Sequence, residues 1–470
     1  MSKTDYIPTI GLEIHAELKT RTKMFCNSKN DSDEKRPNVN ICPVCMAHPG
    51  TLPVINKEAV RHILRIGVSV GGELADYTEF DRKSYFYPDI PKGYQISQYK
   101  YPLVSGGSLN GVSITRVHLE EDTARSIHEA DKSLVDFNRA GVPLMELVTE
   151  PVIHSVEEAV FFAKELQLLL RTLGAGEANM EKGEMRIEAN VSVSKDGERG
   201  VKVEVKNLNS FRSVERAIRY EINRQVEEIE KGGKVIQETM GWDEKREVTF
   251  PQRLKEGSHD YRYFADPDLP KIILSEIPDF HKEALLKTLP ELPFVKRQRY
   301  ASLGLKAEDI ETLVQDKTIR DFFDLVVSGK EKEFAIRSAN YITSDLIGIR
   351  MSKNIFTLGK ITAGSFKEMI QMTFDGRLSS RGAKDILHIL FEEGGMVSDI
   401  ASDKKLTQES GPEVIKKAVE IIIAKNPKVV SDYQSGKTSS LQFLIGQVMK
   451  ETKGAGNPTL IKEAFEEILN

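Results

Sequence analysis

The chain has 470 residues, of which 40% are hydrophobic and 29% charged, and its formal net charge is −5. This composition is typical of a folded globular protein and excludes disordered and collagen-like chains. The slightly acidic balance excludes a uniformly basic, DNA-binding protein, so any nucleic acid must be held by a local basic surface.

A chain of this length predicts two or three domains, since one domain usually holds ~100–200 residues. No stretch approaches the ~18 uninterrupted apolar residues that a membrane span needs. The start, MSKTDYIPTIGLEIH, has no basic segment followed by a long apolar one. We therefore expect a cytoplasmic protein with no membrane partner.

Residues 10–18 alternate between apolar and polar side chains, which predicts a half-buried strand. Its polar face carries Glu13 and His15, which are two residues apart and so point the same way. The pair could hold one metal ion or substrate, or it could be a solvated strand face. The predicted core face carries Ile10, Leu12, Ile14, Ala16 and Leu18.

Three cysteines follow, Cys26, Cys42 and Cys45. An odd number of cysteines in a long chain argues against a disulfide framework. A metal-binding knuckle and free thiols both remain open.

Residues 80–99 combine basic and aromatic side chains in an unusually dense way. The segment could be core packing with a solvated rim, or a surface for a nucleic-acid base or a tRNA end. After it, SGGSLNG (105–111) predicts a hairpin turn rather than the serine-rich stretch of an amidase. The basic and aromatic residues are Arg82, Lys83, Tyr85, Phe86, Tyr87, Lys92, Tyr94 and Tyr99.

Acidic residues gather at the ends of two further predicted strands. Glu120, Glu121 and Asp122 end the first, and residues 136–151 add Asn138, Arg139, Glu146 and Glu150. Acids in succession are unfavourable unless a cation neutralises them, and Mg²⁺ prefers oxygen ligands. These stretches predict a magnesium site.

Residues 155–174 are predicted to form a helix, because Ser155 and Glu158 have the spacing of a capping box and Gly174 is placed to end it. Residues 185–193 and 201–207 are predicted to pair antiparallel through a turn at Asp196-Gly197. The pairing puts Met185, Ile187, Val191, Val201, Val203 and Val205 on the core face. It leaves Arg186, Glu188, Asn190, Lys202, Glu204 and Lys206 on a polar face.

Beyond the Pro-rich stretch 289–298 the apolar spacing becomes helical, so the second half is predicted to be mainly α. The polar segment 398–411 is predicted to be a linker before a small helical tail. Gly436-Lys437-Thr438 resembles the end of a P-loop, but the first glycine is replaced by Ser431. No common nucleotide-binding or hydrolase motif and no glutaminase active site is visible.

Together these stretches resemble the B-subunit family of the glutamyl-tRNA(Gln)/aspartyl-tRNA(Asn) amidotransferases, from IGLEIHAEL to the C-terminus. The segments that carry the resemblance are IGLEIH (10–15), CPVCMAHPGTLPVIN (42–56), FDRKSYFYPDIPKGYQISQY (80–99), HLEED (118–122), DFNRAGVPLMELVTEP (136–151), EVKNLNSFRSVERAI (204–218), DYRYFADPDLP (260–270) and FLIGQVMKETKGAGNP (443–458).

The resemblance implies an α+β fold in three parts. These are a β-rich cradle domain with mixed or antiparallel sheet at 1–293, a helical domain at 294–405, and a helical tail similar to the YqeY family at 406–470. It also implies a ligase that forms carbon–nitrogen bonds as one member of a heterotrimer. The implied partners are an amidase (glutaminase), which is the A subunit, and a small C subunit.

The implied reaction is ATP-dependent phosphorylation of the side-chain carboxylate of glutamate or aspartate misacylated onto tRNA, followed by attack of ammonia on the acyl phosphate. ATP and Mg²⁺ are the implied cofactors. By the same resemblance the catalytic positions are Glu13, His15, Glu121, Glu150 and Lys206, and the Mg²⁺ ligands Glu13, His15, Glu121, Glu150 and Glu188. The substrate- and ATP-binding positions are Tyr85, Tyr87, Lys92, Asn138, Arg139, Asn207, Asn209 and Arg262, and tRNA contacts in the tail are Lys437, Lys450 and Lys453.

The chain departs from the family pattern at two places. Many members carry a C-x-C pair before C-x-x-C, which makes a zinc knuckle, whereas here Ser28 stands at the second position of the first pair. Zinc bound by Cys26, Cys42 and Cys45 would need His48 or water as a fourth ligand. The family's usual aspartate in R-C-D-A-N is here Glu188, which keeps the carboxylate on a longer arm.

Two other interpretations stay open. The first is a non-catalytic tRNA-binding protein that keeps only the tail's RNA contacts, although the intact acidic stretches argue against it. The second is the archaeal-type homologue that acts on glutamyl-tRNA(Gln) alone, for whose inserted domain the chain leaves no room. The sequence does not decide whether Asp-tRNA(Asn), Glu-tRNA(Gln) or both are substrates.

Overall fold

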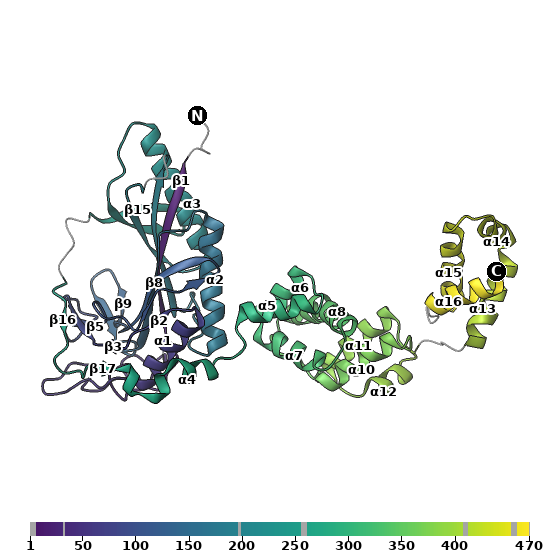
Figure 1. Ribbon diagram of the computed structural model, residues 1–470, viewed down its shortest axis with the longest axis horizontal. Helices are drawn as coiled ribbons and strands as arrows, with labels where there is room; N and C mark the ends of the chain where they lie inside the picture. Colours follow the sequence, from purple (N-terminus) through teal and green to yellow (C-terminus); the bar gives the residue numbers. More distant parts are fainter. Residues whose placement is uncertain are drawn as a thin grey trace. The chain divides into compact units, whose positions relative to one another are not determined.

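The computed structural model describes residues 6–31, 33–195, 199–254, 261–407, 412–452 and 458–469. The chain divides into two compact units, Met1–Pro293 and Phe294–Asn470. The first combines a large sheet with helices and the second is helical (Figure 1). The predicted α+β class is confirmed.

The first unit is built on a ten-stranded mixed sheet in the order β15-β14-β13-β12-β1-β11-β8-β6-β2, with β7 paired to β8. All of its pairs are antiparallel except β13 with β14. The strands are β1 Ile7–Glu17, β2 Glu73–Leu74, β6 Val104–Ser105, β7 Ser108–Leu109, β8 Val112–Glu121, β11 Pro143–Thr149, β12 Met185–Ser194, β13 Val203–Leu208, β14 Glu238–Asp243 and β15 Val248–Leu254.

Alternation in the sequence explains how β1 sits in this sheet. All five residues predicted for its core face are buried, and Glu13 and His15 lie on the opposite face. The predicted antiparallel pairing of residues 185–193 with 201–207 is also confirmed. The core position assigned to Val201 is wrong, because β13 begins only at Val203 and leaves Val201 45% exposed. The turn predicted at Asp196-Gly197 lies outside the described residues.

Three helices of the first unit cover the apolar face of the sheet and enclose its main hydrophobic core (Figure 1). In α2 the predicted cap is present, since Ser155 Oγ accepts from the Glu158 backbone N–H and Gly174 ends the helix with a positive φ. Only glycine adopts such a φ at little cost. The helices of this unit are α1 Lys57–Ser69, α2 Val156–Leu173, α3 Phe211–Glu230 and the short α4 Lys282–Lys287, with the 3₁₀ turns η2 Leu274–Glu276 and η3 Pro278–Phe280.

Three small sheets complete the first unit. The basic-aromatic segment 80–99 forms a hairpin of β4 and β5, which β16 extends. SGGSLNG forms turns around β7, as predicted. The remaining strands are β3 Tyr77–Thr78, β4 Asp81–Ser84, β5 Tyr94–Ser97, β9 Arg125–His128, β10 Ser133–Asp136, β16 Phe264–Ala265 and β17 Ile272–Ile273.

The second unit is helical, as predicted. The linker predicted at 398–411 is wrong for its first part, because residues 397–403 form α12 with Val397 and Ala401 fully buried; residues 408–411 lie outside the description. The elements are α5 Pro293–Ser302, α6 Ala307–Gln315, α7 Lys317–Val327, α8 Lys332–Asn340, the π-helix η4 Tyr341–Leu346, α9 Ile347–Lys353, α10 Ala363–Phe374, α11 Ser380–Glu392, α12 Val397–Asp403, α13 Pro412–Lys425, α14 Pro427–Gln434, α15 Ser439–Glu451 and α16 Pro458–Leu469.

The last four helices, α13–α16, pack around a hydrophobic cluster of their own. The three-part division at 1–293, 294–405 and 406–470 stays a prediction. Within the described ranges, no helix has the length and apolar character that crossing a membrane demands.

Candidate active site

Rows of polar side chains cross the face of the large sheet that lies opposite the helices. In the strand register, His15 of β1 lies between Arg186 of β12 and Glu146 of β11, and Glu146 faces His118 of β8. Directly opposed residues of antiparallel strands project to the same side. The register therefore brings these four side chains together although they come from four separate parts of the sequence.

Carboxylates surround the His15 ring. Its Nε2 atom lies 3.4 Å from Glu146 Oε2, and it is also 3.7 Å from Glu120 Oε1 and 3.9 Å from Glu13 Oε1. Glu146 Oε2 also lies 3.2 Å from His118 Nε2. We call Glu13, His15, His118, Glu120 and Glu146 the histidine–carboxylate cluster.

The cluster shifts the pKa values of its members in opposite directions. Burial lowers the pKa of His15, but the hydrogen bond to Glu146 and the surrounding negative charges outweigh it and raise that pKa to about 9. Burial raises the pKa of Glu146, but His118 and His15 hold it well below its usual value. Glu13 has a raised pKa, because it is buried and faces the charges of Glu146 and Glu188. Burial and these two neighbouring charges therefore disfavour the ionised form of Glu13.

A second acidic group begins at Glu13. Glu188 is its direct partner across the β1–β12 pair, and Glu204 lies on neighbouring β13. Glu13, Glu188 and Glu204 each have one carboxylate oxygen within 4.8 Å of an oxygen of the other two. Lys206 Nζ lies 2.7 Å from Glu188 Oε2 and 3.5 Å from Glu204 Oε1. Burial opposes the Lys206 charge, but these two carboxylates raise the pKa of the lysine.

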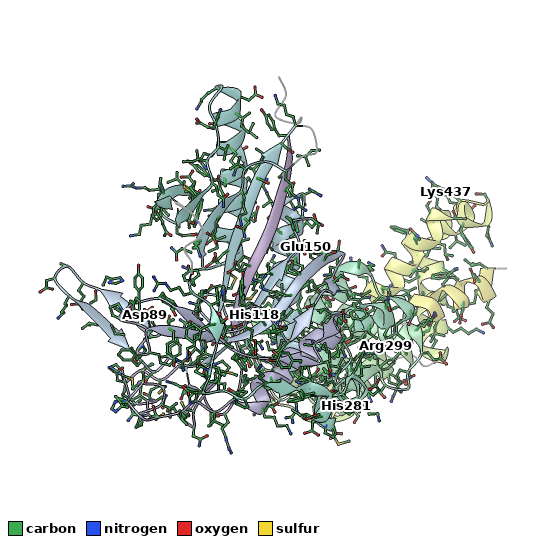
Figure 2. All side chains as sticks on the ribbon, turned by 60° about the vertical axis from the view of Figure 1, so that its left-hand side comes forward. Asp89, His118, Glu150, His281, Arg299 and Lys437 are labelled. Atoms are coloured by element: carbon green, nitrogen blue, oxygen red, sulfur yellow. The ribbon has the colours of Figure 1, made fainter. Side chains whose placement is uncertain are left out.

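Two predicted members of this centre, Glu121 and Glu150, lie apart from it. Glu121 follows Glu120 on β8, so the two side chains point to opposite faces of the sheet. Glu121 pairs with Lys92 at 2.7 Å and accepts from the Ile96 backbone N–H. Glu150 follows the end of β11, where it accepts from Thr115 Oγ1, and Figure 2 shows it well separated from His118. The structure brings Glu120 and Glu146 to His15 instead.

A buried ion network borders the cluster. Asp122, 4% exposed, accepts from Arg139 Nε at 2.6 Å and from Arg186 Nη2 at 2.8 Å. Arg139 Nε also lies 2.9 Å from Glu17 Oε1. Burial raises the pKa of Asp122, but the two guanidinium groups keep it below its usual value. Arg139, predicted to bind substrate, is thus held by the protein's own acids.

Aromatic rings and a lysine stand beside the same carboxylates. Tyr99 stacks on Tyr263 with ring centroids 4.3 Å apart, and Tyr261 meets Tyr263 edge to face. Lys83 Nζ lies 5.0 Å from the centre of the Tyr261 ring. Burial lowers the pKa of Lys83, but the charges of Glu120 and other neighbours raise it. This arrangement suits an anionic ligand that carries a planar ring.

Known proteins resemble this chain over almost its full length. Residues 8–277 match the family model described as the GatB/GatE catalytic domain, and residues 321–469 match the one described as the GatB domain. The chain belongs to the GatB/GatE family. Three of its relatives are named as the B subunit of aspartyl/glutamyl-tRNA(Asn/Gln) amidotransferase. The one from Crocosphaera subtropica is 41% identical over 100% of this chain and 98% of its own length. Those from Thermotoga maritima and Thermomicrobium roseum are each 42% identical over 99% of both chains.

The other positions carried over from the GatB/GatE family are differently placed. Asn138 is 4% exposed and ties the backbone together, since its amide oxygen accepts from the N–H groups of Val39 and Asn40 and its nitrogen donates to Arg36 O. Asn207 and Asn209 line a separate pocket beside the start of α3. Arg262 is exposed beside Tyr261 and Tyr263.

The tyrosines predicted to bind substrate lie in the turn between β4 and β5. Burial raises the pKa of Tyr85, and the nearby carboxylates add to the effect, whereas Tyr87 is 67% exposed. Their rings lie 6.1 Å apart. No described contact links either ring to His15 or Glu13.

Four residues of the centre were not assigned a catalytic or ligand role by the resemblance: Lys83, His118, Glu120 and Glu146. Glu120 and Glu146 lie in the acidic stretches that predicted a magnesium site, and Lys83 lies in the basic-aromatic segment. The sequence carries a signal for three of them. His118 and Glu120 are two apart on one strand, as Glu13 and His15 are, and Glu146 lies between the buried Met145 and Leu147. Lys83 alternates with Arg82 in a short strand, and its direction depends on how the hairpin packs.

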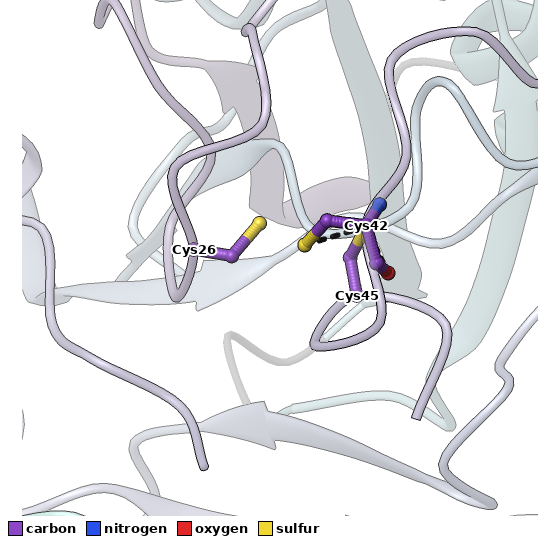
Figure 3. Close-up of side chains that lie close together, drawn as sticks. All are labelled: Cys26, Cys42 and Cys45. Atoms are coloured by element: carbon purple, nitrogen blue, oxygen red, sulfur yellow. Dashed lines mark hydrogen bonds between the residues drawn. The ribbon is translucent and has the colours of Figure 1, made fainter. Parts of the chain in front are cut away.

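The three cysteines lie together, but the fourth cysteine position of the expected zinc knuckle is Ser28. The sulfur atoms of Cys26, Cys42 and Cys45 lie within 4.8 Å of one another (Figure 3). Ser28 Oγ, 3.8 Å from Cys45 Sγ, stands where the fourth sulfur would be. A structural zinc site takes four Cys or His ligands. Among the described residues no histidine or carboxylate joins these sulfurs closely enough to serve.

In the tail, Lys437 and Lys450 are exposed, and Lys437 lies 3.9 Å from Asp432. Residues 427–434 form α14, so the segment before Gly436 is helical and makes no phosphate-binding loop. Lys453, the third predicted tRNA contact, lies outside the described residues.

Proposed function

We propose that this chain is the B subunit of a tRNA-dependent amidotransferase. Working in a multi-subunit complex, it uses ATP to phosphorylate the side-chain carboxylate of glutamate or aspartate misacylated onto tRNA. Ammonia from a separate amidase subunit then displaces the phosphate. The observation that carries the proposal is the set of carboxylates around Glu13, whose oxygen atoms lie within 4.8 Å of one another and could share a bound cation.

The chemistry needs no nucleophile from this chain. An oxygen of the substrate carboxylate attacks the γ-phosphorus of ATP, its bond to phosphorus forms, and the bond to the ADP oxygen breaks. Nitrogen of ammonia then attacks the acyl phosphate, phosphate leaves, and the amide remains on the tRNA. The chain therefore has to orient two anions and balance their charge.

The residues present fit a magnesium ion at two places. Glu13, Glu188 and Glu204 offer three oxygen atoms, and Glu13, Glu146 and His15 offer a second set. When bound, Mg²⁺ would neutralise charge on the phosphates of ATP. The proposed ligand set keeps Glu13, His15 and Glu188 from the expected one. It contains Glu146 and Glu204 in place of Glu121 and Glu150.

The chain's cations complete the proposed site. Lys206 holds Glu188 and Glu204 in position, and Lys83 presents a positive charge beside the Tyr261 ring. The ring faces of Tyr99 and Tyr263 offer a stacking surface for a base, of ATP or of the tRNA 3′ end. Without a metal ion, protonated His15 keeps Glu146 ionised. To join Glu13 and Glu146 as a ligand, His15 would have to give up that proton when Mg²⁺ binds.

A non-catalytic tRNA-binding protein is not favoured. Such a protein would have no use for several carboxylates gathered on a largely buried sheet face, because burying negative charge is costly. The named relatives also match the chain over almost its full length.

The test reconstitutes the chain with the amidase and small subunits encoded in the same genome. We expect ATP hydrolysis that depends on misacylated tRNA, and formation of glutaminyl-tRNA(Gln), asparaginyl-tRNA(Asn) or both. Glutamine should support amidation only with the amidase subunit present, whereas a high ammonium concentration should replace that subunit.

The Glu13→Ala variant should lose tRNA-dependent ATP hydrolysis while the complex still hydrolyses glutamine. Full ATP hydrolysis in a folded Glu13→Ala complex would show that the carboxylate set has another purpose. Amidation from glutamine by the chain alone would overturn the division of labour.

A further inference from the structure

The sulfur of Cys45 is surrounded by groups that favour a thiolate. The Cys42 backbone N–H donates to Cys45 Sγ at 3.1 Å, and Ser28 Oγ lies 3.8 Å away. Lys23 Nζ lies 3.9 Å from the same sulfur. An N–H donor and an ammonium both stabilise the negative form of sulfur.

Lys23 has no exposed surface, although it is a lysine. Its ammonium donates to the Phe137 carbonyl oxygen at 3.0 Å and points to Cys45. A buried charge is costly unless an opposite charge or good acceptors lie beside it. A Cys45 thiolate supplies that opposite charge.

A second thiol lies in position to form a bond with this sulfur. Cys42 Sγ is 3.8 Å from Cys45 Sγ, and the two residues occupy one tight C-x-x-C turn (Figure 3). A disulfide needs a sulfur separation of about 2.05 Å. Rotation of two side chains within the turn can close the difference, since Cys42 is only partly buried.

Cys45 is only 6% exposed, but one side of it faces a pocket. It lines an open pocket of about 300 Å³ together with Cys26, His48 and Lys92. A small oxidant can therefore approach the sulfur without unfolding of the sheet.

We propose that Cys42 and Cys45 form a reversible dithiol–disulfide pair, oxidised by low-molecular-weight disulfides. The Cys45 thiolate attacks one sulfur of the external disulfide, forms a mixed disulfide and releases one thiolate. Cys42 then loses its proton to solvent, attacks Cys45 Sγ and releases the second thiolate. Two electrons pass from the protein dithiol to the external disulfide, which becomes two thiols. The inference rests on the cysteine contacts alone and does not depend on the proposed function.

Oxidation would remove the negative charge beside Lys23 and leave its ammonium buried with the Phe137 carbonyl. The disulfide form should therefore be the less stable state around residues 42–51, which form one wall of the pocket. The pair would act as a redox switch for residues 42–51, which would be more stably folded in the reduced protein than in the oxidised protein.

The test equilibrates the full-length protein with a series of reduced and oxidised glutathione mixtures, traps free thiols with N-ethylmaleimide, and maps tryptic peptides by mass spectrometry. Cys42 and Cys45 share one tryptic peptide, which Lys29 and Lys35 separate from Cys26. An internal disulfide thus makes that peptide two hydrogen atoms lighter and unalkylated, while Cys26 stays alkylated. Three alkylated cysteines at every glutathione ratio would overturn the proposal, as would a peptide cross-linked to Cys26.

Variants separate the proposed pair from a structural role. Cys26→Ser should retain the internal disulfide and Cys45→Ser should lose it. Lys23→Met keeps the volume of the side chain but removes the charge that stabilises the reduced form. The Cys42–Cys45 disulfide of this variant should therefore persist at a ratio of reduced to oxidised glutathione about tenfold higher than in the wild-type protein. An unshifted Lys23→Met variant that is folded would contradict the role given to the ammonium.

Ser28→Cys is the matched control for metal, because it restores a fourth sulfur next to Cys45. We expect this variant to bind zinc and to resist oxidation, and the wild-type protein to release zinc to a chelator. Wild-type protein that keeps one zinc per chain against the chelator, with unreactive cysteines, would overturn the proposal.

Discussion

Glu146 lies 3.4 Å from His15 on β1 and 3.2 Å from His118 on β8, so one carboxylate joins three neighbouring strands. On this contact we propose that the centre of the site is at Glu146 and not at Glu150, four residues later. The two positions carry the same side chain, and they allow a direct comparison.

Glu146→Gln should lower the tRNA-dependent ATPase rate by about 10²-fold or more, the usual effect of removing one preorganised electrostatic group. Glu150→Gln, which removes a partner of Thr115 at the strand end, should change the rate little. Steady-state assays of both complexes give the comparison. Equal losses in both variants, or a larger loss at Glu150, would return the site to the position expected from the sequence.

The stability of the metal-free protein should fall as pH rises through the pKa of His15. That pKa is raised from 6.5 to about 9, so the stabilisation is complete below pH 6.5 and is lost as pH passes about 9. Its size should be at most about 3 kcal/mol. Urea unfolding in EDTA at several pH values measures it, and the decline should be smaller in His15→Gln. Parallel declines in the two proteins would exclude His15 as the source.

Asp122→Asn should destabilise the protein by about 3–5 kcal/mol, because it leaves the charges of Arg139 and Arg186 without their shared buried partner. The pKa of Asp122 is lowered in the folded state, so its contribution is present at neutral pH and is lost as pH falls through that lowered pKa. Asp279→Asn, which breaks an exposed pair with Lys57, is the control and should have little effect. Similar midpoints of unfolding for both variants would contradict this account.

Replacing Lys437 and Lys450 by alanine together should weaken the binding of misacylated tRNA and reduce the slope of its salt dependence by about 2, if each lysine neutralises one phosphate. ATP binding should be unchanged. Lys462→Ala is a control, because it removes one positive charge from α16 at a position outside the predicted tRNA contacts. An unchanged KM for tRNA across a salt series would show that these lysines face solvent only.

The strand β8 shows why sequence alternation located part of the site and not all of it. Val112 and Ile114 are buried at even positions, whereas Val117 and Leu119 are buried at odd ones. The alternation of buried and exposed residues along β8 changes phase where its pairing with β11 shifts, between Val148 and Thr149 of β11. Beyond that irregularity His118 and Glu120 share the polar face, and Glu121 leaves it.

β1 was predictable because it has no such irregularity, so one alternation fixed both of its faces. The approach of His118, Glu146 and Lys83 was not predictable from a single strand, because it depends on the order of β12, β1, β11 and β8 in the sheet. The three-cysteine cluster was anticipated as a group of thiols. Its contact with the buried Lys23 depends on how segments 23–28 and 42–45 fold together.

β1 is synthesised well before both of its neighbours in the sheet. Its partners are residues 143–149 and 185–194, so the strand must wait until residue 194 has been synthesised before its second edge is covered. At a typical ~5–20 residues per second this leaves an apolar strand unpaired for about ten seconds or longer. Nascent chains stalled before residue 194 should therefore recruit chaperones or aggregate, whereas chains stalled after it should already protect β1 from proteolysis.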